Sequence, residues 1–439
     1  MSFLYEIGNA KVTIADQLNP DIEWVQSYSE ARAWGKDGES FPFLGLPVAI
    51  NKFLATPITH AEIEEVHALM GYSDQFPRAM FEHIVDNHNG FLPVTIIGKK
   101  EGDILEPGEV AYTIENTDPL CAVLPIYLDR VMLRYSWFGT TYARKLCRFV
   151  REIDRFASAT SDASASYHGR VCGQYVASEL NEMAQGYAYM LLGLDPDISG
   201  AMFLNRHYQT NLISSPSMVS EHNAILSWGG AENEFTYLER MLTRNPDDFV
   251  GLFVDTYDAD RVMREYIPKL LPLIQKRTIP VLLSVDGTNV YRDIIHYRDV
   301  LEELVGVRLN EHGFKVLNAP IRLSQGDDID HDTLVKIIDR LIADGWSVEN
   351  FFFLLTDDNL HNEFGRGVLG FIQKICATKD NLGKLVSVNK SPVTELRKTT
   401  KKGVQCVRDG MLYYHNGKVI AETFEAVQLR LLQHQRNNQ

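Results

Sequence analysis

The chain has 439 residues, a length that predicts two or three domains. It carries 43 Lys and Arg residues against 58 Asp and Glu residues, so its formal net charge is −15. A surface this acidic repels phosphate backbones, which argues against nucleic acid as a partner. Hydrophobic residues make up 45% of the chain and charged residues 23%, a balance that excludes disorder for most of it.

Cysteine usage and the first residues indicate the compartment. The five cysteines are scattered without a CxxC pair, at Cys121, Cys147, Cys172, Cys376 and Cys406. This favours free thiols in a reducing compartment and argues against a structural zinc site. The start, MSFLYEIGNAKV, lacks the basic segment and apolar run of a signal peptide. No stretch holds the roughly 18 apolar residues of a membrane span, so we expect a soluble cytoplasmic protein.

Short alternating strands and glycine turns are predicted near both ends of the chain, at 88–119 and at 385–421. Their similarity indicates one mixed α+β domain built from both chain ends, residues 1–150 together with 377–439. The remaining residues, 151–376, are then an inserted domain.

The inserted domain alternates apolar runs with segments of helical periodicity. The runs are 249–255, 279–286, 320–327 and 349–355. Apolar runs without alternation predict strands buried on both faces, as parallel sheets require. Strand and helix in alternation then predict either a doubly wound sheet or an α/β barrel.

Apolar residues at helical spacing predict helices at 294–304 and 334–342. Gly345 follows the second of them in a C-cap position. The helix after the first strand contains Pro268 and Pro272, so we expect it to be kinked or split.

The expected strand ends carry acidic residues. In both candidate folds the carboxyl ends of the strands face the active site. Here those ends carry Asp255, Asp286 and the pair Gly326-Asp327. A single Asp at such a position can simply cap the next helix. Three at consecutive strand ends favour a functional site.

Two short motifs carry side chains suited to chemistry. Tyr167 precedes Arg170 by three residues, so an aromatic ring and a guanidinium could hold a planar ligand and an anion. Glu221 precedes His222, and a carboxylate beside an imidazole can stabilise its protonated form. Each pattern is also common among ordinary surface and structural residues, so neither decides a function by itself.

A lysine-rich stretch near the C-terminus contrasts with the acidic chain. Its members are Lys374, Lys390, Lys398, Lys401 and Lys402. Local positive charge indicates an anion such as pyrophosphate, although a solvated loop has the same composition. Walker A, GxGxxG, HExxH and GxSxG motifs are absent, which removes the common nucleotide-binding and hydrolase mechanisms.

Eight segments together resemble nicotinamide phosphoribosyltransferases over nearly the whole chain. They are SYSEAR (27–32), LPVAINKFL (46–54), EPGEVAYTIENTDP (106–119), EHNAILSWG (221–229), VDTYD (254–258), QGDDID (325–330), WSVEN (346–350) and KKG (401–403). The resemblance implies an irregular α/β barrel of the type II phosphoribosyltransferase kind, joined to a mixed domain. It also implies a homodimer with shared active sites, Mg²⁺, and ATP that can phosphorylate the catalytic histidine.

The reaction implied by the resemblance joins the nicotinamide ring nitrogen to C1 of a pyrophosphorylated ribose and expels pyrophosphate. The resemblance assigns catalysis to His222, Glu221 and Asp286, and nicotinamide binding to Tyr167, Arg170 and Asp195, with Asp197 as the alternative to Asp195. It assigns ribose binding to Asp255, Asp286, Gly326 and Asp327. It assigns pyrophosphate binding to Arg32, Arg366, Lys374, Lys390 and Lys398. Carboxylates suit a cationic sugar, and basic residues suit the leaving pyrophosphate.

The chain departs from the family at three places. The glycine-rich loop that binds the ribose 5′-phosphate is replaced by residues 354–359, which include Asp357 and Asp358. Ser284 stands where the family has an arginine, and Ala10 where it has a partner-subunit tyrosine. Two aspartates would repel a terminal phosphate dianion.

These departures suggest a donor without a bare 5′-phosphate. ADP-ribose 1-pyrophosphate fits, with Ser284, Asp357 and Asp358 lining its 5′ end and NAD⁺ as the direct product. This is similar to the nicotinamide ADP-ribose transferase branch of phage NAD⁺-restoring pathways, which would place the chain in a host cytoplasm. The alternatives are phosphoribosyl pyrophosphate as donor, with nicotinamide mononucleotide as product, and an inactive protein that binds nicotinamide or its nucleotides.

Overall fold

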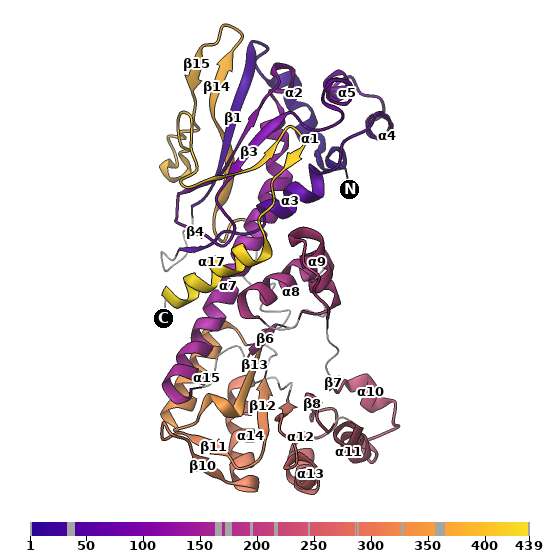
Figure 1. Cartoon of the computed structure of the whole chain (residues 1–439), viewed down its shortest axis with the longest axis vertical. Coiled ribbons are helices and arrows are strands. Elements are labelled where there is room, and N and C mark those ends of the chain that lie inside the picture. The colour runs from indigo at the N-terminus through magenta and orange to yellow at the C-terminus, as the bar shows by residue number, and fades with distance from the viewer. Residues whose placement is uncertain are drawn as a thin grey trace. The chain divides into compact units, whose positions relative to one another are not determined.

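The chain folds into two compact units, drawn in Figure 1. The first unit comprises Met1–Arg144, Phe203–Asn211 and Glu363–Gln439, and the second comprises Lys145–Met202 and Leu212–Asn362. The computed structural model describes residues 2–32, 40–162, 169–171, 178–193, 196–214, 218–244, 246–285, 287, 289–325, 329–355 and 365–437.

The borders of the units differ from those that the sequence predicts at residues 150 and 376. Strand β14 (Phe371–Asp380) runs unbroken across residue 376 and pairs with β1 (Ile22–Ala31) from Ala31↔Phe371 to Ile22↔Asp380. The whole of β14 therefore belongs to the first unit.

The first unit is built on an antiparallel sheet with strands from both chain ends. The strand order is β15-β14-β1-β5-β3-β16-β17. Besides β1 and β14, the sheet contains β3 (Val94–Gly98), β5 (Val110–Asn116), β15 (Leu385–Ser387), β16 (Met411–His415) and β17 (Lys418–Val419). A separate two-stranded sheet pairs β2 (Phe41–Pro42) with β4 (Ile104–Leu105). The prediction of a mixed domain built from both chain ends is confirmed.

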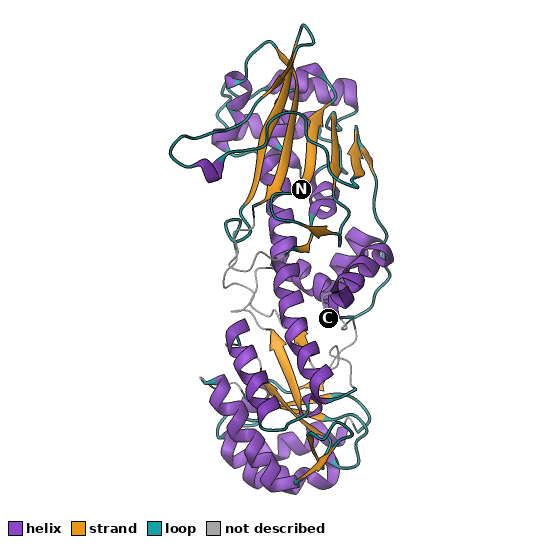
Figure 2. Cartoon of the chain, turned by 90° about the vertical axis from the view of Figure 1, so that its left-hand side faces the viewer, coloured by secondary structure: helices purple, strands orange, loops and turns teal. Residues whose placement is uncertain are grey.

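Helices pack on this sheet, and Figure 2 shows helices and strands in both units. They are α1 (Asn9–Val12), α2 (Ile14–Gln17), α3 (Leu46–Phe53), α4 (His60–Leu69), α5 (Arg78–His88), α6 (Leu124–Tyr127) and α17 (Phe424–Asn437), with short 3-10 turns η1 (Phe3–Glu6), η2 (Pro119–Cys121) and η6 (Leu396–Lys398). Helix α7 (Asp129–Thr160) begins in the first unit and ends in the second. Helix α4 starts at a capping box, in which Thr59 and Glu62 each accept the other's backbone N–H.

A buried carboxyl group attaches the mid-chain segment 203–211 to the first unit. Glu101 is fully buried, and it accepts hydrogen bonds from the Gly45 N–H and, at 2.7 Å, from the Tyr208 hydroxyl. Burial raises the pKa of Glu101 to about 8, although both hydrogen bonds act to lower it. Tyr208 ends helix α9 (Ile198–Tyr208), so the bond fixes this helix end in the first unit.

The second unit contains a parallel sheet of six strands in the order β6-β13-β12-β9-β8-β7. They are β6 (Gly169–Val171), β7 (Met218–Val219), β8 (Val250–Phe253), β9 (Val281–Ser284), β12 (Ile321–Gln325) and β13 (Phe351–Leu355). Four of them coincide with the four apolar runs, so the prediction of buried parallel strands is confirmed. A short antiparallel pair, β10 (Val307–Leu309) with β11 (Lys315–Leu317), lies outside this sheet.

The strand order distinguishes a barrel from a doubly wound sheet. From β7 to β13, strands that follow one another in the parallel sheet are neighbours, and β6, the first in the chain, pairs with β13, the last. This is the cyclic order of a barrel, whereas a doubly wound sheet reverses direction at a switch point. Among the described residues no pairing joins β6 to β7, so the barrel is open there. The irregular α/β barrel is thus confirmed.

The remaining helices belong to the second unit. They are α8 (Ser178–Leu192), α10 (His222–Leu226), α11 (Glu234–Arg244), α12 (Ala259–Arg261), α13 (Ile267–Ile274), α14 (Val290–Val305) and α15 (His331–Ala343), with the 3-10 turn η5 (Val348–Asn350). The predicted helices are α14 and α15, and Gly345 follows α15 with a φ of 76°, as a C-cap requires.

The proline-containing helix is split, as predicted. A π-helical turn, Val262–Tyr266, separates α12 from α13, and Pro272 lies inside α13. Among the described residues, no helix combines the length and apolar character that a membrane span needs.

We predict that Tyr208→Phe lowers the free energy of unfolding by about 1–3 kcal/mol, because it removes a donor from a buried carboxyl group. The control is Tyr5→Phe, since the Tyr5 hydroxyl donates to Glu65 at 2.6 Å at an exposed position. That variant should stay within about 0.5 kcal/mol of the wild type. Urea unfolding at pH 8 gives both values, and equal losses would contradict the assigned role of Glu101.

Candidate active site

Parallel pairing brings the residues that follow β7, β8 and β9 to one edge of the sheet. Val250 pairs with both Met218 and Val281. Beyond the strands, the Ser220 N–H donates to the Gly251 carbonyl at 2.8 Å. The segments that follow β7 and β8 therefore start side by side. The first of these segments carries Glu221 and His222, and the second carries Asp255 and Thr256.

His222 is the first residue of α10, and Glu221 is its N-cap. The Glu221 carboxylate accepts from the Ala224 N–H at 3.2 Å and from the Asn223 side-chain amide at 3.0 Å. Glu221 therefore places His222 by fixing the start of the helix, which is a positioning role.

The imidazole of His222 is oriented by the neighbouring loop. Its Nδ1 lies 2.9 Å from the Thr256 hydroxyl, and its ring packs against Phe253 with a centroid distance of 4.9 Å. A hydroxyl can donate or accept, so Thr256 can hold the ring before and after it gains a proton. Sequence reasoning missed Thr256, although it directly follows the expected strand-end residue Asp255.

A buried glutamate close to this edge was also missed. Glu234 begins α11 and is 1% exposed, and its Oε1 has no hydrogen-bond partner among the described residues. Burial raises the pKa of Glu234 to about 7, the charges of Asp255 and Asp258 add to the rise, and Arg261 opposes it. No pattern in the sequence marks this residue, because its burial follows from tertiary packing.

Ser284 lies on the sheet face that Phe253 occupies. The two residues are paired in register across β8 and β9, and Ser324 pairs with Ser284 on the other side. Paired residues of adjacent strands point to the same face. Ser284 is buried, and within the described part of the chain its hydroxyl has no hydrogen-bond partner. This polar position therefore shares a face with the ring that contacts His222.

Several predicted site residues lie outside the described residues: Tyr167, Asp195, Asp286, Gly326, Asp327, Asp357 and Asp358. Arg170 is at the centre of β6, paired with Leu354 of β13. Asp197, the alternative to Asp195, accepts from the Gly200 N–H and the Ser199 hydroxyl, each at 2.7 Å, and so caps α9.

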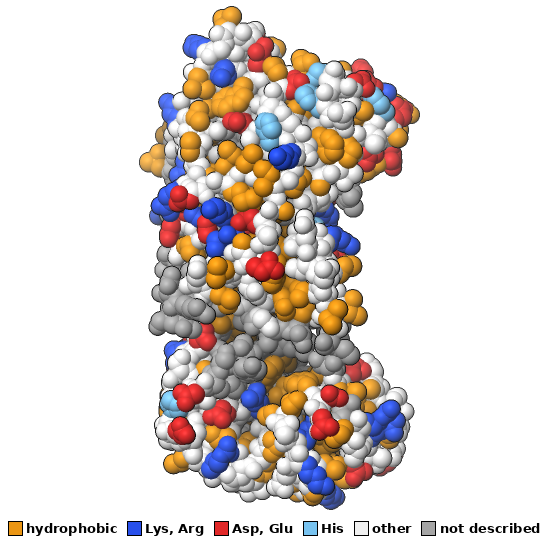
Figure 3. Space-filling view, viewed as in Figure 1, with side chains coloured by type: hydrophobic (Ala, Val, Ile, Leu, Met, Phe, Trp, Pro, Cys, Tyr) orange, Lys and Arg blue, Asp and Glu red, His pale blue; other side chains and the backbone are white. Residues whose placement is uncertain are grey.

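Three of the five predicted pyrophosphate residues interact in the first unit, where Lys374 lies within electrostatic range of the other two, Lys390 and Arg366. Partial burial of the Lys374 ammonium lowers the pKa of Lys374, and Lys390 and Arg366 lower it further by repulsion. Lys11, which was not assigned to this role, adds to the repulsion, and Asp129 opposes it. Lys11 itself forms an ion pair with Asp129. Figure 3 shows Lys and Arg side chains gathered among acidic ones on this unit.

Arg32 and Lys398 are related through the backbone of a loop. The Arg32 guanidinium donates to Glu30 at 2.9 Å and to the carbonyls of Arg397 and Thr399, which flank Lys398. Arg32 thus holds the loop that carries the exposed Lys398.

Comparison with known proteins identifies the family. The family model described as "Nicotinamide phosphoribosyltransferase, N-terminal domain" matches residues 2–96. The nicotinamide phosphoribosyltransferase of Xanthomonas campestris pv. campestris (strain 8004) is 30% identical over 398 residues, which cover 88% of this chain and 83% of the relative. The chain belongs to the nicotinamide phosphoribosyltransferase family. This is a family of pentosyltransferases.

Further relatives agree with this membership of the nicotinamide phosphoribosyltransferase family. The Mycoplasma genitalium nicotinamide phosphoribosyltransferase is 25% identical over 309 residues, covering 66% of this chain and 65% of that protein. Human nicotinic acid phosphoribosyltransferase superposes with a TM-score of 0.58 at 11% identity, covering 98% of this chain and 92% of the human chain. Nicotinate-nucleotide pyrophosphorylase from Pyrococcus furiosus gives a TM-score of 0.52 at 14% identity, covering 98% and 97%. These solved structures support the fold.

We predict that Glu234→Gln stabilises the protein at high pH. The raised pKa means that the folded protein binds more protons than the unfolded chain between about pH 4.5 and pH 7, so the free energy of unfolding falls as pH rises through that window. A neutral Gln side chain does not show this pH-dependent loss of stability. The free energy of unfolding of Glu234→Gln should therefore exceed that of the wild type by about 1–3 kcal/mol at pH 8, and the difference should vanish near pH 4.

Urea unfolding at pH 4, 6 and 8 measures this difference. Glu239→Gln is the matched control, because Glu239 is exposed on the same helix, and it should follow the wild type at each pH. If the difference in unfolding free energy between Glu234→Gln and the wild type did not change with pH, the raised pKa of Glu234 would be contradicted.

Proposed function

We propose that the chain transfers a pentosyl group from a 1-pyrophosphorylated donor to nicotinamide in NAD⁺ biosynthesis. The nicotinamide ring nitrogen forms a bond to C1 of the sugar, while the bond from C1 to oxygen breaks and its electron pair leaves with pyrophosphate. Similarity to the Xanthomonas campestris relative over 88% of the chain, with His222 oriented at the carboxyl edge of the barrel, carries this proposal.

The second unit supplies groups suited to the sugar centre. Positive charge develops on the ribose as pyrophosphate leaves, and carboxylates such as that of Asp255 stabilise it. Carboxylate oxygens also suit Mg²⁺, which would disperse the charge of the leaving group. ATP, implied by the family resemblance, would phosphorylate His222 on Nε2, because Thr256 contacts Nδ1.

The first unit supplies groups suited to pyrophosphate. Lys390 and Arg366 each repel the charge of Lys374, and a bound anion would relieve that repulsion. In the family, two subunits share each site, and we propose the same arrangement for this chain. Ala10, in place of the family's tyrosine, is exposed on α1 next to Lys11, whose charge also acts on Lys374.

We predict that Lys374→Met raises the KM for the donor about tenfold or more, with a smaller effect on the KM for nicotinamide. Lys379→Met is the matched control. Lys379 lies on the same strand, and its ammonium contacts the Trp24 ring at 5.4 Å. Steady-state kinetics with varied donor measures both variants, and equal changes in the two would remove Lys374 from pyrophosphate binding.

For the donor, we propose ADP-ribose 1-pyrophosphate, which gives NAD⁺ in one step. Ser284 supports this donor, because a neutral, buried hydroxyl occupies the position where the family resemblance implies an arginine. The aspartates at 357 and 358 support it as well, since they disfavour a terminal phosphate. The names of the relatives favour the second candidate, phosphoribosyl pyrophosphate, with nicotinamide mononucleotide as the product.

A competition assay separates the two donors. Purified protein receives nicotinamide, Mg²⁺ and equal amounts of both donors, and chromatography separates NAD⁺ from the mononucleotide. We predict an excess of NAD⁺ for the wild type and a shift of about tenfold towards the mononucleotide for Ser284→Arg, since the added cation favours a terminal phosphate.

The control for added charge is Thr243→Arg, at an exposed position on α11, which should keep the wild-type product ratio. Circular dichroism checks that both variants fold. Mononucleotide as the main wild-type product would establish the second candidate. The absence of both products would leave a protein that binds nicotinamide or its nucleotides without turnover.

A further inference from the structure

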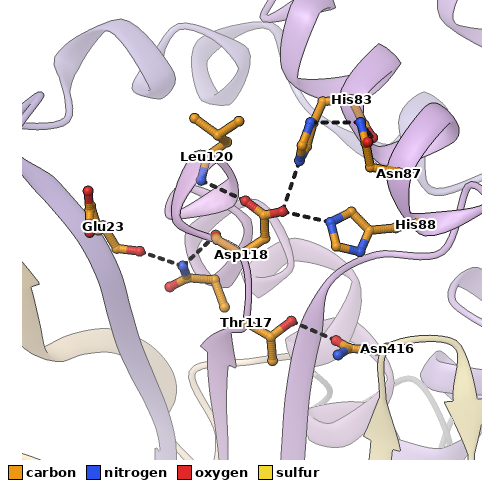
Figure 4. Close-up of polar contacts among 9 residues, drawn as sticks. Glu23, His83, Asn87, His88, Thr117, Asp118, Leu120 and Asn416 are labelled. Carbon is orange, nitrogen blue, oxygen red and sulfur yellow. Dashed lines mark hydrogen bonds and ion pairs between the residues drawn. The ribbon is translucent and has the colours of Figure 1, made fainter. Parts of the chain in front are cut away.

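Two histidines of the first unit converge on one aspartate. His83 and His88 lie on helix α5, and Asp118 is the N-cap of η2, within the ENTDP segment (115–119). Figure 4 shows both rings pointing toward the Asp118 carboxylate from the same helix. None of the three belongs to the residues assigned to pentosyl transfer.

The contacts place three ligand atoms around one point. Asp118 Oδ2 is 2.8 Å from His83 Nε2 and 2.7 Å from His88 Nε2. The three atoms lie within 4.8 Å of one another. Two imidazole nitrogens and one carboxylate oxygen form a donor set that Zn²⁺ binds, with water as a further ligand.

The surroundings hold these ligands in place. The Leu120 N–H donates to Asp118 Oδ1 at 2.8 Å, and the Asn116 amide donates to the Asp118 carbonyl at 2.8 Å. The side-chain amide of Asn87 lies 3.0 Å from His83 Nδ1. Such partners behind the ligands orient them and strengthen metal binding.

We propose that His83, His88 and Asp118 bind one Zn²⁺ ion, with water completing its coordination. The side chains are 24%, 25% and 16% exposed, so water and metal can reach them. A tetrahedral ion with ligands at about 2.0–2.1 Å separates neighbouring ligand atoms by about 3.3 Å. The ligands need to open by roughly half an ångström, a small side-chain adjustment.

Binding also requires a defined histidine tautomer. The metal takes Nε2 of His83, so the proton moves to Nδ1 and the Asn87 amide presents its oxygen instead of its nitrogen. Without metal, both histidines donate to Asp118. Burial then acts to raise the pKa of Asp118, but the hydrogen bonds from His83, His88 and the Leu120 N–H together hold that pKa below its usual value.

The scattered cysteines argue only against a cysteine-based zinc site, and a histidine-carboxylate site needs none of them. A bound ion would connect the C-terminal end of α5 to the segment that follows β5. It would therefore stabilise the folded state of the first unit, by an amount that grows with the logarithm of one plus the zinc concentration divided by the dissociation constant.

Zinc titration of the full chain tests the site. Protein stripped with a chelator is titrated with Zn²⁺ in competition with a chromophoric indicator. We expect one ion per chain, and binding at least tenfold weaker in His88→Gln, whose amide still donates to Asp118. His60→Gln is the matched control, because His60 Nε2 contacts a single carboxylate, that of Asp86, at 2.8 Å. It should bind Zn²⁺ like the wild type.

A second variant and a second measurement guard against a misfolded protein. Asp118→Asn keeps a cap oxygen for the Leu120 N–H but loses the charged ligand. At one zinc concentration, Zn²⁺ should raise the thermal midpoints of the wild type and of His60→Gln by the same amount, and raise those of both ligand variants clearly less. Equal zinc affinity in all four proteins, or no uptake by the wild type, would overturn the proposal. Neither measurement depends on enzymatic turnover.

Discussion

Parallel pairing of β7, β8 and β9 is the constraint on which the candidate site depends. Register fixes which residues follow the strands at one edge, and it places Phe253 and Ser284 on one face. Once the register is set, the loop after β8 can supply Thr256 to His222, 34 residues away in the chain. A one-residue slip would turn these side chains to the opposite face.

The candidate site also depends on the local contacts that position its side chains. Glu221 accepts a hydrogen bond from the Ala224 N–H at the start of α10, so its neighbour His222 begins the helix in a fixed orientation. In the first unit, the charges of Lys390 and Arg366 act on Lys374 and lower its pKa, although Asp129 opposes them, and such local positive charge favours an anion. In the proposed reaction, the first of these sets would act at the sugar and the second at the leaving group.

Much of the fold could be predicted from the sequence, because buried parallel strands leave a continuous apolar signal. The four runs coincide with β8, β9, β12 and β13. Periodicity does not report strand order, so it fits a barrel and a doubly wound sheet equally well; only the family resemblance favoured the barrel, which the pairing of β6 with β13 confirms. The sequence does not predict that residues 203–211 belong to the first unit, because this depends on the long-range hydrogen bond from Tyr208 to Glu101.

The candidate site was predictable in part. His222 was assigned through the family resemblance of the EHNAILSWG segment, because the Glu-His pair alone does not decide a function, whereas the burial of Glu234 depends on tertiary packing. His83, His88 and Asp118 were missed because 30 residues separate the aspartate from the nearer histidine. Sequence spacing reveals metal ligands only when they are close in the chain.

The most direct test of the central claim is the stoichiometry of a single reaction, with His222→Asn beside the wild type. Nicotinamide labelled in its carboxamide is incubated with Mg²⁺ and either donor, and the pyrophosphate and the labelled pyridinium product are quantified together. We expect equal amounts of the two from the wild type, and a loss of about a hundredfold or more in His222→Asn. Pyrophosphate released without a labelled product, or an unimpaired His222→Asn, would contradict pentosyl transfer at this site.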